Sequence, residues 1–146
     1  MSRKNKGNFL KSYEVILSEP HLIKEGMLIS TALNLLAKEI RADNETWWRN
    51  PATGEKLTRN RPEMMMLMVS EIAEAMEGFR KDLMDDKLPH RKMETVEFAD
   101  LFIRLMDYVG EFCPDFGEAV AEKREFNKAR KDHTPEARLA ENGKKF

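Results

Sequence analysis

Residues 62–83 read PEMMMLMVSEIAEAMEGFRKDL, and this stretch decides the fold. Pro62 is well placed to begin a helix, and apolar residues then follow on nearly every side of that helix. Glu71 and Glu74 are spaced i, i+3, which places both carboxylates on one helical face. A helix this apolar is normally buried, so two acids within it need a partner that neutralises their charge.

Two stripes of side chains follow from helical periodicity along this segment. The predicted core stripe consists of Met65, Met68, Val69, Ile72, Met76 and Phe79. Leu67 and Gly78 bracket the two acids on a second stripe, where Gly78 is expected to leave room beside them. Met64 and Met66 lie away from the core stripe, so the helix is more apolar than a four-helix monomer needs. We therefore expect a homo-oligomer, and a dimer first.

A second acidic pair follows 22 residues later, where Glu97 and Asp100 are again spaced i, i+3. The core stripe predicted for this helix consists of Phe98, Phe102, Leu105 and Val109, and the other side carries Met93, Glu97, Asp100, Arg104 and Asp107. By itself this acidic stripe is typical of a solvated face, with Arg104 pairing to its neighbours. Helices joined by a short break pack as antiparallel neighbours, so both pairs can converge. Converging carboxylates repel unless a cation neutralises them, and their hard oxygens suit Mg²⁺ or Mn²⁺.

The whole chain is expected to be all-α, with a four-helix bundle-like core in a single domain over 1–146. Helices are predicted over 22–47, 62–83, 90–112 and 115–131, within a helical core over 21–131. Residues 1–20 form a polar lead-in, 49–61 a loop, and 132–146 a polar tail. Asp115 and Glu118 resemble a capping box at the start of the fourth helix. No segment alternates at period two, which argues against a sheet.

Composition excludes several classes of function. The 25 basic and 26 acidic residues nearly cancel, so there is no electrostatic case for binding a nucleic-acid polymer. No apolar run is long enough to span a membrane, and no apolar segment of a signal peptide follows the basic N-terminus, so we expect a cytoplasmic protein. The single Cys113 rules out a disulfide framework and a cysteine-based zinc site. Phosphate-binding glycine loops and a nucleophile elbow are absent, so no side chain is assigned as a nucleophile.

The fourth helix and the two tryptophans are candidates for contacts with a ligand. Lys123, Asn127 and Arg130 share one helical face, and these side chains suit phosphate oxygens, although an ordinary solvated face is the alternative. The tail adds Lys144 and Lys145. Trp47 and Trp48 point about 100° apart on a helix, so one can pack in the core while the other stacks on a base or closes a lid. Packing of both is the other interpretation.

The motif Glu71-Ile-Ala-Glu74, a 22-residue spacer and Glu97-Phe-Ala-Asp100 resembles the signature of the MazG-like, all-α nucleoside triphosphate pyrophosphatases. Its context supports the resemblance, which covers residues 62–133 and includes the run VSEIAEA over 69–75 and the later Lys123, Asn127 and Arg130. The resemblance implies that the four acids hold Mg²⁺ and that water attacks the α-phosphorus of a nucleoside triphosphate, which yields a monophosphate and pyrophosphate. It also implies phosphate or sugar contacts from Lys123, Asn127 and Arg130, and a dimer or tetramer.

Two alternatives remain beside this hydrolase. A related enzyme could use the same fold on another pyrophosphate substrate, such as phosphoribosyl-ATP or an alarmone, because the acids contact only the common part of such substrates. A non-catalytic helical module that binds metal or nucleotide is the other. It is disfavoured because all four signature acids are present.

Overall fold

The computed structural model describes residues 25–143, and its chain divides into two compact units. The second unit spans Asn34–Pro114, while the first contains the described residues before and after that range. The described helices are α2 (Glu25–Asp43), α3 (Arg61–Lys81), α4 (Met93–Phe112), α5 (Phe116–Lys128) and α6 (Pro135–Leu139), with 3-10 turns η2 (Glu45–Trp48) and η3 (Lys131–His133). The expected lead-in over 1–20, the helix start at Leu22, and Lys144 and Lys145 lie outside the described residues.

The all-α class is confirmed, because residues 25–143 form helices and no strand. Only two isolated bridges occur there, between Arg49 and Lys56 and between Met84 and Lys92. Among these described helices, none has both the length and the apolar composition needed to cross a membrane. The short helix α6 was not predicted, although Thr134 and Pro135 carry its start signal. The Thr134 side chain accepts from the backbone N–H of Ala137, and Pro135 follows in the first turn.

Local signals define both ends of α3. The Asn60 side chain accepts a hydrogen bond from the backbone N–H of Glu63, and Pro62 lies in the first turn, as expected for a helix start. At the other end Asp82 takes φ of 52°, in the left-handed region that terminates many helices. The helix therefore ends at Lys81, two residues before the predicted end.

The loop between α3 and α4 is longer than predicted, because α4 begins at Met93 rather than near His90. Buried Asp85 organises this loop by accepting hydrogen bonds from the backbone N–H groups of Lys87, at 3.0 Å, and Leu88. The capping box predicted for α5 is wrong for the side chain of Asp115. Asp115 occupies the N-cap of α5, but its side chain makes no capping hydrogen bond.

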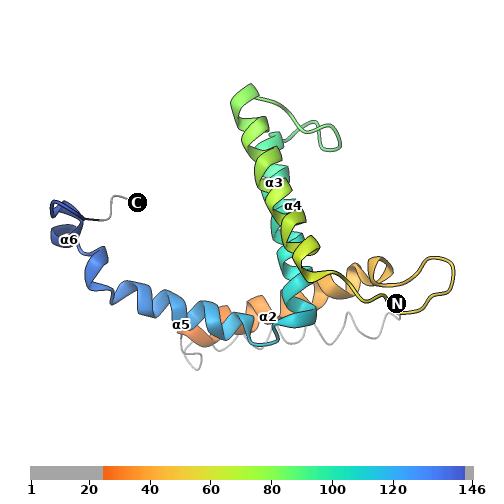
Figure 1. Ribbon diagram of the computed structural model, residues 1–146, viewed down its shortest axis with the longest axis horizontal. Helices are drawn as coiled ribbons and strands as arrows, with labels where there is room; N and C mark the ends of the chain where they lie inside the picture. Colours follow the sequence, from red (N-terminus) through yellow and green to blue (C-terminus); the bar gives the residue numbers. More distant parts are fainter. Residues whose placement is uncertain (1–24, 144–146) are drawn as a thin grey trace. The chain divides into compact units, whose positions relative to one another are not determined.

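Helices α3 and α4 lie side by side (Figure 1) and contact each other along much of their length. A close approach at Gly78 allows this packing, since a Cβ there would lie 2.9 Å from the Cβ of Met93. The sequence predicted that Gly78 would leave room beside the acids. Instead, the start of α4 fills that space.

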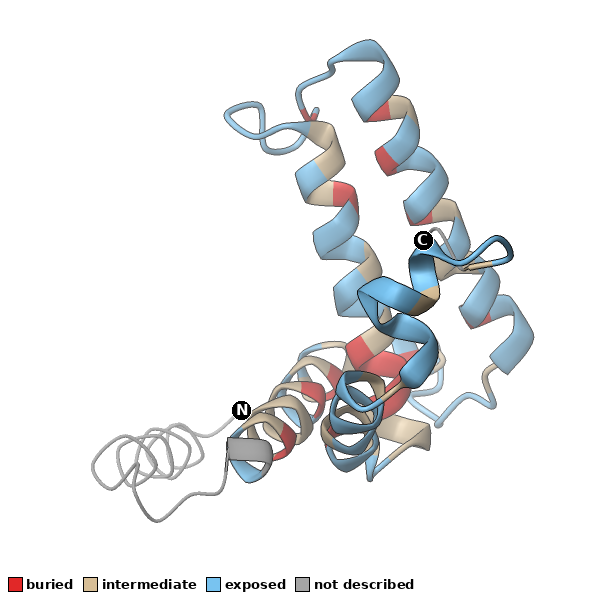
Figure 2. Cartoon of the chain, turned by 90° about the vertical axis from the view of Figure 1, so that its left-hand side faces the viewer, coloured by how far each residue is buried: buried red, intermediate tan, exposed pale blue. Residues whose placement is uncertain are grey.

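The predicted core stripes of both helices are wrong in part, because the pair packs through a different face. The buried residues of α3 are Met64, Glu71, Ala75 and Gly78. The exposed members of the predicted stripes are Met65, Val69, Ile72, Met76 and Phe79 on α3 and Phe98 and Phe102 on α4. Figure 2 shows isolated buried residues along the upper parts of the two long helices and a gathering of buried residues at their foot, where residues 106–109 of α4 are all buried. Because α3 is apolar on several sides, periodicity alone could not identify the side that contacts α4.

Helix α4 also crosses the C-terminal half of α2 within the second unit. A Cβ at Gly110 would lie 2.5 Å from the carbonyl oxygen of Ala37 and 2.8 Å from the Cβ of Arg41. Glycine therefore permits the contact that places Arg41 near the end of α4.

Gly110→Ala is expected to lower the free energy of unfolding by about 1–3 kcal/mol, the usual range for overpacking. The direction of the change in the free energy of unfolding is informative, because helix propensity alone would make the alanine variant more stable by about 1 kcal/mol. Urea denaturation followed by circular dichroism measures the difference. A variant more stable than the wild type would contradict the close crossing of α2 and α4.

Candidate functional site

An acidic cluster forms where α3 and α4 meet. Glu71 of α3 and Glu97 and Asp100 of α4 each offer a carboxylate oxygen, and these oxygens all lie within 4.8 Å of one another. Glu71 is 5% exposed and Glu97 is 8% exposed, whereas Asp100 is exposed. One member of the first motif thus meets both acids of the second motif. This acidic triad could hold a metal ion.

Glu97 is the member whose charge is most strongly disfavoured. Burial raises its pKa from 4.5 to about 7, and a hydrogen bond with Glu71 and the negative charges of Glu74, Glu71 and Asp100 act in the same direction. A shift of this kind indicates that protein groups alone do not neutralise the cluster. A bound cation would favour the ionised form of Glu97 instead.

Glu74 has a weaker place in the cluster than the sequence predicted. Its side chain is exposed, and it is not among the three acids whose oxygens converge. Its charge nevertheless contributes to the raised pKa of Glu97. Its role as a fourth metal ligand stays a prediction.

Arg104 of α4 supplies a positive charge at the edge of the cluster. Its Nε donates to Oε1 of Glu71 at 2.7 Å, and its side chain is 44% exposed. The sequence expected Arg104 to pair with its neighbours, and the structure pairs it with an acid on the other helix. A single guanidinium leaves the group of nearby carboxylates with a net negative charge.

The two tryptophans have different environments. Trp48 is 1% exposed, and its Nε1 donates to both oxygens of Asp107, at 3.0 and 3.1 Å. The Arg41 guanidinium lies over its ring, 4.2 Å from the centroid. Trp48 therefore offers no free ring face and is the tryptophan that packs in the core, as the sequence allowed for one of the two. Trp47 is 73% exposed, and its role in stacking stays a prediction.

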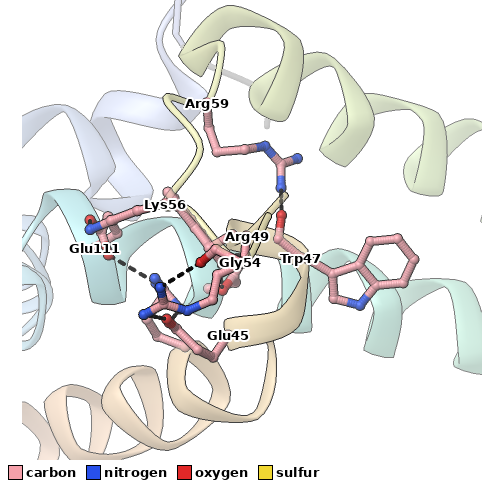
Figure 3. A network of polar contacts seen from close by, with 10 residues as sticks. Glu45, Trp47, Arg49, Gly54, Lys56, Arg59 and Glu111 are labelled. Carbon is pink, nitrogen blue, oxygen red and sulfur yellow. Dashed lines mark hydrogen bonds and ion pairs between the residues drawn. The ribbon is translucent and has the colours of Figure 1, made fainter. Parts of the chain in front are cut away.

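A polar network holds the segment that carries both tryptophans. Arg41 donates through Nε to Glu111 at 2.9 Å and through Nη1 to Glu45 at 2.8 Å. Lys56 also binds Glu111, and its hydrogen bond holds the pKa of that carboxyl below its usual range despite partial burial. Figure 3 shows Lys56 beside Glu111, and it shows the Trp47 indole pointing away from this network. The network joins α2, the 49–59 loop and α4.

Sequence reasoning did not identify Arg41, Arg59 or Asp107 as residues of this region. Asp107 was placed only on the acidic side of its helix, while its partner Trp48 lies 59 residues earlier. Pairing across such a distance leaves no periodic signal. For Arg41 and Asp107 the available signal was a charged side chain on an amphipathic helix, whereas Arg59 lies in the loop before α3 and had no such signal.

The predicted phosphate and sugar contacts lie on or just after α5, in the first unit. Lys123 Nζ lies 4.7 Å from the ring centroid of Phe126, and Arg130 Nε donates to Asp132 at 2.9 Å. Asn127 is partly buried, and its Oδ1 has no hydrogen-bond partner within the described range. The structure defines these residues within their own unit, so their contact with a nucleotide stays a prediction.

Comparisons of this chain with models of protein families, with curated proteins and with solved structures found no match. The likeness to MazG-like pyrophosphatases therefore rests on the motifs quoted above, and the acidic cluster stands on the geometry of its own residues.

The raised pKa of Glu97 predicts that stability depends on pH without a divalent cation. Between about pH 4.5 and 7 the folded state keeps a proton that the unfolded state releases. The contribution of protonated Glu97 to folding stability is complete below pH 4.5 and disappears as pH rises through about 7. Urea denaturation in chelator at pH 5 and pH 8 measures the change.

Glu97→Gln serves as the reference, because a neutral amide at this position does not titrate. The wild type should lose more stability than Glu97→Gln between the two pH values. Equal pH dependence of the two proteins would contradict a buried, repelled Glu97.

Proposed function

We propose that this protein is a metal-dependent nucleoside triphosphate pyrophosphohydrolase. It converts a ribo- or deoxyribonucleoside triphosphate to the monophosphate and pyrophosphate by attack of water at the α-phosphorus. The observation that carries the proposal is the convergence of Glu71, Glu97 and Asp100 from two separate acidic motifs. The MazG-like signature supports the choice of reaction.

The donor set fits a hard divalent cation. Carboxylate oxygens suit Mg²⁺ and Mn²⁺, and the described residues offer no sulfur or imidazole ligand in this cluster. Glu71, Glu97 and Asp100, with Glu74 beside them, would hold the ion. When bound, Mg²⁺ neutralises phosphate charge and lowers the pKa of a coordinated water.

Other side chains would bind and orient the substrate. Arg104 lies next to the acids with a half-exposed guanidinium, and this planar donor suits phosphate oxygens. We assign the same class of contact to Lys123, Asn127 and Arg130, as the sequence pattern indicates. Hydrolysis of an anhydride needs no nucleophilic side chain, because positioning and charge stabilisation supply most of the catalysis.

We also propose that the protein works as a homodimer. The exposed stripe of Val69, Ile72, Met76 and Phe79 on α3 is apolar, and Phe98 and Phe102 on α4 are exposed as well. Exposed apolar surface of this extent usually marks an interface. A second copy could cover the stripe through a two-fold contact.

Glu71→Gln and Asp100→Asn are each expected to reduce kcat by more than about 100-fold, since even indirect partners of metal ligands cost 10- to 100-fold. The assay separates pyrophosphate from orthophosphate over a panel of nucleoside triphosphates with Mg²⁺. Glu63→Gln, an exposed acid on the same helix, is the control and should keep full activity. Full turnover of both cluster variants, or of the wild type in excess chelator, would refute the proposed function.

Light scattering at micromolar concentration is expected to give the mass of two chains rather than 17.0 kDa. Ile72→Lys should shift the mass toward one chain, because a buried lysine would carry an uncompensated charge. Leu139→Lys replaces an exposed apolar residue of α6 outside this stripe and is the control. A monomeric wild type would refute the dimer.

A further inference from the structure

A pocket of about 350 Å³ adjoins the acidic cluster and lies wholly within the second unit. Two residues connect this pocket with the cluster. Asp100 lines the pocket and belongs to the cluster, and Arg104 lines the pocket and donates to Glu71. Met64, Leu67 and Ile103 supply apolar lining. A volume of this size is within the range of small-molecule sites. Since the triphosphate would lie at the acids, the pocket is placed for the other end of a nucleotide.

Asp107 gives the pocket a buried hydrogen-bond acceptor. This residue is 7% exposed, and its two oxygens offer about four acceptor positions. Trp48 Nε1 donates to both oxygens, and the Asn44 side chain donates another hydrogen bond. These contacts leave about one acceptor position, and a buried acceptor favours a ligand that presents an N–H donor.

Arg59 supplies the complementary donor. Its Nη1 donates to the Trp47 carbonyl at 2.9 Å (Figure 3), and this is one of the five N–H donors of a guanidinium. Arg59 and Trp47 line the same pocket as Asp107. Burial raises the pKa of Asp107, and the hydrogen bonds from Trp48 and Asn44 and the charges of Arg41 and Arg59 offset part of that rise.

We propose that this pocket binds the base of the nucleotide and selects bases with an exocyclic amino group, an inference that rests on the proposed function. Asp107 accepts from the amino group, Arg59 donates to the neighbouring ring nitrogen or carbonyl, and Trp47 stacks on the base. Cytosine, adenine and guanine each present an amino group beside a ring nitrogen that accepts. Uracil and hypoxanthine present a carbonyl where the amino group stood, which places two acceptors against each other and leaves the remaining acceptor position of Asp107 without a donor.

Nucleosides test the pocket separately from catalysis, because they carry no phosphate and need no metal. Affinities of cytidine, uridine, adenosine and inosine are measured by ligand-observed NMR in chelator. We expect at least about tenfold tighter binding of cytidine than uridine and of adenosine than inosine, because a buried acceptor without a donor weakens binding by about that factor. Equal affinities within each pair, or a preference for uridine and inosine, would overturn the proposal.

Three variants assign the preference to residues. Asp107→Asn should abolish or reverse the preference for amino-bearing bases, since an amide can donate to a carbonyl. Asp43 is an exposed acid at the end of α2, so Asp43→Asn is the control and should leave the preference unchanged. Trp47→Ala should weaken binding of all four nucleosides similarly. If Asp107→Asn does not fold, the nucleoside preference of the wild type and the affinities of Trp47→Ala test the proposal instead. Nucleoside affinities in Trp47→Ala that equal those of the wild type would overturn it.

The outcome separates this inference from the proposed function. Metal-dependent release of pyrophosphate without any amino preference would overturn the pocket assignment alone. An amino preference among nucleosides, with no hydrolysis of any triphosphate, would support the pocket and refute the pyrophosphohydrolase.

Discussion

Mutual repulsion among carboxylates at the contact of α3 and α4 is the constraint on which the site depends. Glu71 and Glu97 are buried against each other although both are acidic, and burial raises the pKa of Glu97 to about 7. An apolar pair of the same size would pack without this penalty. The helices therefore keep an arrangement that costs stability, and such sites are commonly functional. Arg104 offsets only part of the charge, which leaves a role for a divalent cation.

A second interaction fixes the surroundings of the cluster. Arg41 lies over Trp48 and binds Glu45 and Glu111, while Trp48 donates to Asp107. The close approach at Gly110 permits these contacts. Buried networks of this kind hold side chains in one geometry when their members are satisfied. The network thus fixes the position of Asp107 in the second unit, while the indole of the base-stacking candidate Trp47 is exposed.

Local patterns in the sequence predicted the helices and the acidic pairs, because i, i+3 spacing depends only on helix geometry. They failed for the packing face of α3, which is apolar on several sides, so Ile72 and Phe79 were expected in the core and are exposed. Contacts such as that of Trp48 with Asp107, 59 residues apart, carry no periodic signal and could not be predicted. Helical spacing likewise predicted that Lys123, Asn127 and Arg130 share one face. Spacing does not say what that face contacts, so the ligand of these residues stays a proposal.

The central claim is that the acids of the two motifs form one cation site. Titration of the metal-free protein with Mn²⁺, followed by electron paramagnetic resonance of the free ion, tests this claim without any assumption about the substrate. We expect saturable binding to the wild type that is lost in the double variant Glu71→Gln, Glu97→Gln and unchanged in Glu63→Gln. Equal Mn²⁺ binding by the double variant and the wild type, or no saturable binding at millimolar Mn²⁺, would contradict the claim.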